Sequence, residues 1–241
     1  MQTSPLKHWA LLGYLVLVWG FAFALIAVAL ESLHPTFIVW CRLWMGAVVM
    51  WCVWRWRGTP WSLGAAWWPR LVLLSVAGNI IPFSLIAWAE LSVPSAEVGI
   101  LMALMPIATL LLAHWLLEHE PLTWIRFSGV LMGFAGVGLL VGEDLFQSGM
   151  QGQLPGQLAT LLATLSYAFN GVYAKRIPDA DPVALSLGTL FVGGLMLAIP
   201  ACLLQSAGLG FAFSAESVSV LLLLGVMGTG LATWAFFVVV S

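Results

Sequence analysis

Charged side chains are scarce in this sequence of 241 residues, because Asp, Glu, Lys and Arg together make up only 7% of it. A soluble domain carries about one quarter charged residues, so this chain has too few to cover the surface of a water-soluble fold. The formal net charge is −2 and there is no basic cluster. These features indicate that nucleic acid is not a partner.

Cysteine and the motifs of catalysis are also nearly absent. The three cysteines, Cys41, Cys52 and Cys202, lie in apolar runs, and their spacing fits neither a disulfide framework nor a zinc site. No serine–histidine–acid set, phosphate loop or metal-binding helix motif is present. The polar turn 118–120 (Glu-His-Glu) offers too few converging ligands for a metal. We therefore expect no catalytic residue, no metal and no cofactor.

Long apolar runs, in contrast, are abundant, because 62% of the residues are hydrophobic. A helix needs about 20 apolar residues to cross the hydrocarbon core. The first run is long enough to span, so it is predicted to be a retained helix and not a signal peptide. The predicted fold class is an all-α integral membrane protein, a bundle of transmembrane helices. Eight spans are predicted: Trp9–Leu30, Pro35–Trp54, Leu71–Trp88, Pro94–Leu117, Trp124–Val141, Leu158–Ala174, Pro182–Leu204 and Val218–Val240.

The distribution of Lys and Arg predicts the orientation, because short loops rich in these residues stay in the cytoplasm. With the N-terminus inside, all basic residues except Arg42 fall on the cytoplasmic side. The opposite loops carry acidic residues only. We therefore expect a multi-pass protein of the inner (plasma) membrane with a cytoplasmic N-terminus. The cytoplasmic basic residues are Lys7, Arg55, Arg57, Arg70, Arg126, Lys175 and Arg176.

An internal repeat is visible at an offset of 147 to 150 residues. The offset of 150 places the segment 71–78 on 221–228 with five identities. It corresponds to five helices, and because five is odd, the second copy must be inverted relative to the first. We predict two inverted five-helix repeats, at 9–142 and 156–241. Eight of the ten helices that this arrangement requires precede Ser241, so we expect the second repeat to be incomplete.

Several motifs resemble the EamA-type branch of the drug/metabolite transporter superfamily. They are the pair Trp19-Gly20, an arginine at position 42, the segment from Val93-Pro94-Ser95-Ala96 to Met105-Pro106, and Glu120-Pro121-Leu122-Thr123 followed by Gly129, Gly133 and Gly136. The resemblance covers essentially the whole chain. It implies ten helices in two inverted repeats and the export of amino acids or related metabolites.

Two charged residues, Arg42 and Glu90, are predicted to lie at membrane depth. Arg42 is about 10 Å along its helix, at about 1.5 Å per residue, where a charge costs about 2.5–3.5 kcal/mol. Glu90 lies two residues beyond the third predicted span, near its outer end and at a similar depth. We hypothesise that Arg42 and Glu90 pair, or that both line the outer half of a cavity. A purely structural ion pair and a snorkelling arginine are the alternatives.

Further candidate site residues are polar or aromatic side chains within the spans. Ser75 and Asn79 share a helix face with Glu90. Pro106 frees the carbonyl of Met102 near the midplane, where interrupted helices of transporters commonly bind substrate. Packing in the bundle is the alternative for each of these residues. The predicted substrate-binding residues are Trp19, Arg42, Asn79, Trp88, Glu90, Met102, Pro106, Tyr167, Asn170 and Trp234.

The function predicted from these features is secondary transport, with alternating access to a site between the two repeats. The expected cargo is a small metabolite such as an amino acid, moved out of the cell. A membrane-embedded enzyme acting on a lipid-type substrate is the first alternative, and a truncated, non-transporting scaffold is the second. The expected partners are the lipid bilayer, a small-molecule substrate and a second copy of the chain in a homodimer.

Overall fold

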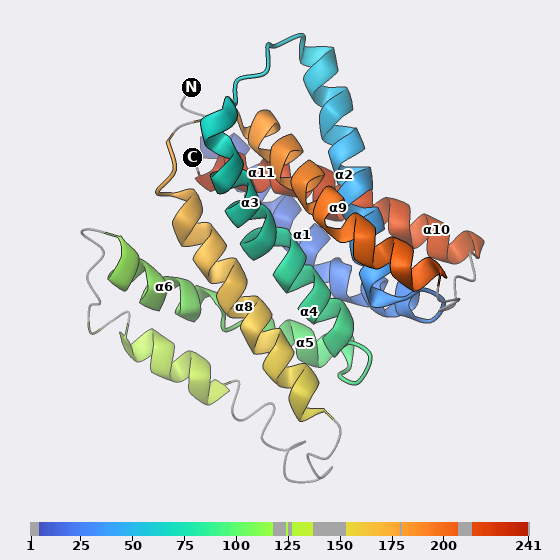
Figure 1. Ribbon diagram of the computed structural model, residues 1–241. Helices are drawn as coiled ribbons and strands as arrows, with labels where there is room; N and C mark the ends of the chain where they lie inside the picture. The colour runs from blue at the N-terminus through green and yellow to red at the C-terminus, as the bar shows by residue number, and fades with distance from the viewer. Residues whose placement is uncertain are drawn as a thin grey trace.

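The computed structural model describes residues 5–117, 124, 127–136, 153–178, 180–206 and 214–240. Over these residues the chain is helical and contains no strand (Figure 1). The elements are α1 (Pro5–Leu30), α2 (Pro35–Arg57), η1 (Ala65–Trp67), α3 (Trp68–Ser75), η2 (Val76–Ile80), α4 (Ile81–Ala89), α5 (Ser95–Met102), α6 (Met105–Leu116), α8 (Leu154–Ala174), α9 (Pro182–Ser206), α10 (Ala215–Leu222), η3 (Leu223–Leu231) and α11 (Ala232–Val240).

Six of the described helical stretches are long and apolar enough to cross a membrane. They are α1, α2, the stretch from η1 to α4, the stretch from α5 to α6, α9, and the stretch from α10 to α11. The prediction of an all-α, multi-pass membrane protein is confirmed. The division into two inverted repeats stays a prediction.

Two of the eight predicted spans are not among these six. The stretch 158–174 is helical within α8, but α8 carries several polar side chains and is not among the six apolar stretches. Of the stretch 124–141, Phe127–Gly136 forms a shorter apolar helix. The rest of that stretch, apart from Trp124, lies outside the described residues.

Both ends of α2 are set by the local sequence. At the start, the Nδ1 atom of His34 accepts the backbone N–H of Thr36 at 3.3 Å. At the end, Gly58 adopts φ 62, a left-handed conformation that only glycine reaches without a Cβ penalty. The N–H of Gly58 then donates to the carbonyl of Arg55 at 3.3 Å. The helix that carries Arg42 is therefore capped at both ends.

The third predicted span is interrupted by a π-helical segment, η2. Pro82 follows η2, and because proline has no N–H it cannot continue the regular α-helical ladder. Ile81 instead donates its N–H to the carbonyl of Val76, five residues earlier. A second π-helical segment, η3, interrupts the last span and includes residues 226–230. The offset of 150 residues places 76–80 on 226–230, so both distortions fall at corresponding positions.

The fourth predicted span is broken, as the sequence predicted. The helix α5 ends at Met102, and α6 begins at Met105 with Pro106 in its first turn. Ala103 and Leu104 lie between the two helices. Because the missing N–H of Pro106 would leave a carbonyl unpaired in a continuous helix, the break falls one turn before the proline.

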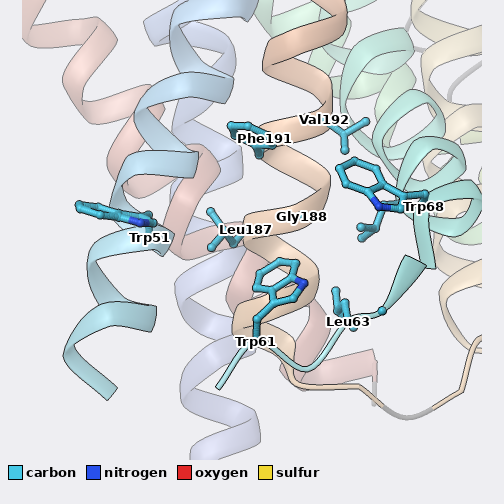
Figure 2. Close-up of a pocket in the computed structure, with 10 residues that line it drawn as sticks. Trp51, Trp61, Leu63, Trp68, Leu187, Gly188, Phe191 and Val192 are labelled. Atoms are coloured by element: carbon cyan, nitrogen blue, oxygen red, sulfur yellow. The ribbon is translucent and has the colours of Figure 1, made fainter. Parts of the chain in front are cut away.

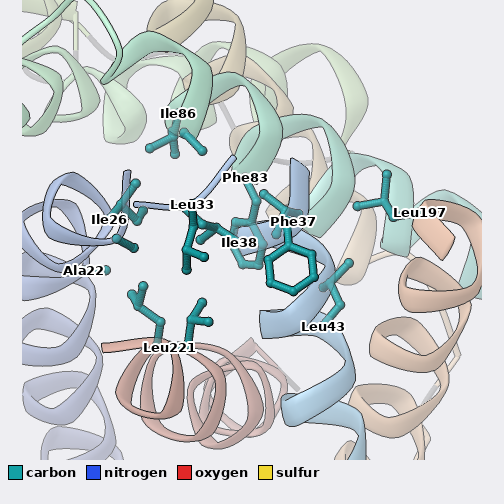
Figure 3. Close-up of a cluster of buried hydrophobic side chains, with 14 of the residues drawn as sticks. Ala22, Ile26, Leu33, Phe37, Ile38, Leu43, Phe83, Ile86, Leu197 and Leu221 are labelled. Carbon is teal, nitrogen blue, oxygen red and sulfur yellow. The ribbon is translucent and has the colours of Figure 1, made fainter. Parts of the chain in front are cut away.

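The helices α2 and α9 pack closely against each other, α2 also contacts η3, and α8 packs on α4. In Figure 1, α8 and α6 lie on one side of α2 and α9, and α10 lies on the other. The largest cluster of buried apolar side chains joins these elements and includes Ile26, Ile38, Leu43, Phe83 and Leu221 (Figure 3). Each is at most 6% exposed. The core of the bundle is therefore centred on α2.

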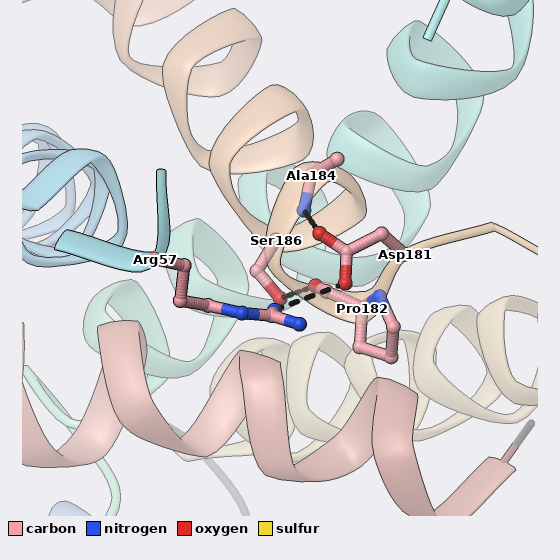
Figure 4. Close-up of polar contacts among 5 residues, drawn as sticks. All are labelled: Arg57, Asp181, Pro182, Ala184 and Ser186. Atoms are coloured by element: carbon pink, nitrogen blue, oxygen red, sulfur yellow. Dashed lines mark hydrogen bonds and ion pairs between the residues drawn. The ribbon is translucent and has the colours of Figure 1, made fainter. Parts of the chain in front are cut away.

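An ion pair joins the end of α2 to the start of α9 (Figure 4). Arg57 Nη1 lies 3.1 Å from Asp181 Oδ1. The other oxygen of Asp181 accepts the backbone N–H of Ala184 at 3.3 Å and so caps α9. Since the Arg57 side chain is 42% exposed, we expect the pair to contribute at most about 1 kcal/mol to stability.

Candidate substrate site

Arg42 is the buried charge at the centre of the bundle, with 2% of its surface exposed. Its Nε donates to the hydroxyl of Thr229 in η3 at 3.2 Å. That hydroxyl donates to the carbonyl of Leu224 at 2.8 Å. A threonine hydroxyl in an α-helix reaches the carbonyl three or four residues earlier, whereas here it reaches the fifth. The π-helical form of η3 thus helps to position the acceptor of Arg42.

An aromatic pair lies on the other side of the guanidinium. Arg42 Cζ is 4.2 Å from the ring centroid of Phe83 in α4. Phe83 packs edge to face on Tyr167 of α8, with 6.3 Å between the ring centroids. A cation over an aromatic ring is stabilised by about 2 kcal/mol when it is desolvated. The buried arginine therefore connects α2, η3, α4 and α8.

Glu90 directly follows α4 as its C-cap residue. It does not form a direct ion pair with Arg42, since the ion pair found among the described residues is Arg57–Asp181. Both carboxylate oxygens of Glu90 are buried and have no hydrogen-bond partner. The hypothesis of direct pairing is wrong in this conformation, because Thr229 is the hydrogen-bond partner of Arg42 instead.

The two asparagines of the predicted site lie on elements that contact each other, η2 and α8. Asn79 in η2 is 5% exposed and Asn170 in α8 is 7% exposed. A Cβ at Gly78 would lie 2.7 Å from the amide group of Asn170, so the missing side chain makes room for this amide. The Oδ1 atom of Asn170 and the Oγ atom of Ser75 are buried without a partner. These two oxygens are therefore the unsatisfied polar atoms beside η2.

The three tryptophans of the predicted site differ in their positions. Trp234 packs against the main buried cluster and, like Trp19, against a smaller cluster of α1 and α11. The ring of Trp19 lies 6.3 Å from that of Phe236. Trp88 is 49% exposed on the outside of α4. The structure therefore does not bring Trp88 to the centre of the bundle.

The helix break contributes one of its two predicted residues to the interior. Met102 packs against the main buried cluster, and its sulfur accepts the hydroxyl of Thr164 at 3.1 Å. The side chain of Pro106 is exposed. Pro106 therefore shapes the break without lining the interior.

Sequence reasoning missed Thr229 as the partner of Arg42. The internal repeat held a signal for it, because the offset of 150 residues places Asn79 on Thr229. It also missed the hydrogen bond that Gln157 of α8 donates to Glu97 of α5. The polar turn 118–120 lies outside the described residues.

Comparisons with known proteins give matches over most of the chain. The model of the EamA-like transporter family matches residues 7–142. A relative named as an uncharacterized transporter of Archaeoglobus fulgidus is 23% identical over 230 residues, which cover 92% of this chain and 75% of the relative. The uncharacterized inner membrane transporter YedA of Escherichia coli K12 is 25% identical over 193 residues, which cover 77% of this chain and 58% of YedA.

A protein of known crystal structure has the same fold. It is 20% identical to this chain and superposes with a TM-score of 0.66, covering 96% of this chain and 78% of the other.

Proposed function

This chain belongs to the EamA-like transporter family, and from that premise we propose that it exports a small metabolite, such as an amino acid, by alternating access. The substrate would bind between the two predicted repeats, 9–142 and 156–241. The relatives are named as transporters, which supports transport as the general activity. The cargo and the direction are our proposal.

The observation that carries the proposal is the buried pair of opposite charges that do not satisfy each other. Arg42 donates one hydrogen bond, from Nε to Thr229, and its two terminal nitrogens donate to none of the described residues. Glu90 accepts none with either buried oxygen. Leaving such groups unpaired is costly in a membrane protein unless they bind a ligand. A substrate with an acidic and a basic group would pair with both.

The packing of the helices supports the alternating-access mechanism. The central contact is between α2 and α9, which occupy corresponding places in the two proposed repeats. Each of the π-helical segments contacts the central helix of the other repeat, η3 against α2 and η2 against α9. In our proposal, the repeats rock about this contact. The site around Arg42 would then open to one side of the membrane at a time.

Glu90 has two alternative roles in the coupling of export to an energy source. It would either carry a proton or only balance the charge of Arg42. In the first case substrate efflux through the Glu90→Gln variant would no longer depend on a proton gradient. In the second case the dependence would be unchanged while the substrate affinity falls.

The experiment is an efflux assay of the chain in vesicles, screened against amino acids and small toxic metabolites. We expect gradient-dependent flux of at least one compound and its loss in the Arg42→Leu variant. The matched control is Arg176→Leu, which removes the same side chain from an exposed position just after α8. Wild-type flux in a stably folded Arg42→Leu variant would refute the role of this site.

A further inference from the structure

A second site lies away from the buried charges, where a cavity of about 310 Å³ opens between the end of α2, the segment 58–67 and α9 (Figure 2). Its lining is almost entirely apolar and includes Trp51, Trp61, Trp68 and Phe191. None of the residues predicted to bind substrate lines it. The cavity is therefore separate from the site around Arg42.

The cavity faces outward from the helix bundle. Trp51, Trp61 and Trp68 are 51%, 44% and 53% exposed. Gly188 of α9 forms part of the wall, and a Cβ at this position would lie 2.9 Å from Cδ2 of Leu71. The space thus depends on a position without a side chain. In a bilayer, an apolar cavity on the outer surface is filled by hydrocarbon, because water finds no hydrogen-bond partners there.

Positive charge lies at the rim of the cavity. Arg55 follows Trp51 by four residues on α2, so both side chains project from the same face of the helix. Its side chain is exposed and makes no hydrogen bond with the described residues. Arg55 lies at the predicted cytoplasmic end of α2, where the leaflet is rich in anionic lipids.

We propose that this cavity binds an anionic phospholipid, with an acyl chain between α2 and α9 and the phosphate group beside Arg55. One methylene-sized group takes up about 30 Å³, so the cavity has room for about ten of them. Ten such groups make up part of one acyl chain. The apolar walls favour binding of the acyl chain. The unpaired side chain of Arg55 favours an anionic headgroup. A bound lipid would bridge the two central helices at their ends.

The test is photocrosslinking in vesicles that hold the whole chain and a phospholipid with a diazirine in its acyl chain. Phosphatidylglycerol and phosphatidylcholine with identical chains are compared. We expect phosphatidylglycerol to label the stretches 51–55 and 187–192. The Arg55→Gln variant should lower the preference for phosphatidylglycerol about fivefold, the effect of about one basic residue near a membrane surface.

Two further variants test the cavity itself. Gly188→Leu fills it and should reduce labelling several-fold, and Trp51→Ala, which removes a wall, should do the same if Gly188→Leu fails to fold. The matched control is Trp56→Ala, because Trp56 is 89% exposed on the same helix and does not line the cavity. Labelling should not change in this control.

Three outcomes would overturn the proposal. Equal labelling by the two lipids would refute the anionic headgroup. Labelling that Gly188→Leu and Trp51→Ala leave unchanged would refute the site. Loss of labelling in the presence of a transported compound would assign the cavity to the substrate instead. None of these results depends on whether the chain exports an amino acid.

Discussion

The substitution Gly46→Ala tests how closely α2 and η3 must approach for Arg42 to keep its partner. A Cβ at Gly46 would lie 3.1 Å from the backbone nitrogen of Gly230 and 3.2 Å from its Cα. Gly46 follows Arg42 by one helical turn, and Gly230 is next to Thr229. The contact between the two glycines therefore sets the distance between arginine and threonine.

The expected displacement follows from these distances. An ordinary Cβ contact begins at 3.4 Å, so the backbones must separate by about 0.3 Å. The hydrogen bond from Arg42 Nε to Thr229 is already 3.2 Å long, the upper end of the usual range. A separation of this size would take it beyond that range. We expect a loss of about 1–3 kcal/mol in the free energy of unfolding, as for other overpacked interiors, and a matching loss of transport.

The assay is unfolding of the purified protein in mixed micelles by increasing amounts of sodium dodecyl sulfate, followed by tryptophan fluorescence. The control is Gly20→Ala in α1, where a Cβ would meet nothing within 4 Å. This control should be neutral or gain up to about 1 kcal/mol from helix propensity. If Gly46→Ala unfolds at the same detergent fraction as Gly20→Ala, the reasoning about the close approach is refuted.

Three further predictions concern single contacts. Thr229→Val should cost about 1–3 kcal/mol of unfolding free energy, because it leaves the guanidinium of Arg42 without its acceptor, whereas Thr229→Ser should stay close to wild type in the same unfolding assay. Arg57→Gln should change the free energy of unfolding by no more than about 1 kcal/mol. A larger loss in both Arg57→Gln and Asp181→Asn would contradict this low value for the exposed ion pair. Ser214 accepts the backbone N–H of Ser217 at 3.0 Å, so Ser214→Ala should cost about 1 kcal/mol and Ser214→Asp should cost less, as measured by thermal unfolding.

The break between α5 and α6 was predictable because proline acts locally. Pro106 lacks an N–H wherever the chain folds, so the interruption follows from one residue. The buried face of the third span was predictable for a similar reason, since the alignment of Ser75 and Asn79 depends on helix geometry alone. The π-helical segment η3 has no proline, and its position could be suspected only from the internal repeat.

The partners across the bundle were not predictable from the sequence in the same way. Arg42 was expected to meet Glu90, since the two were predicted to lie at a similar depth, but it meets Thr229, 187 residues further along the chain. The position of Trp88 on the outside and of the cavity beside Gly188 depends on how helices pack. Contacts of this kind depend on crossing angles and on close approaches, for which apolar sequence carries little information.

The sequence by itself determined that this protein is a helical membrane protein, because composition and the length of apolar runs decide whether a chain is stable in water or in the bilayer. It also indicated which residues could carry function, because a charge within the membrane is too costly to lack a role or a partner. Only the tertiary structure decided which groups meet. The backbones approach at Gly46 and Gly230, and this approach brings the guanidinium of Arg42 to Thr229 while both oxygens of Glu90 stay unpaired.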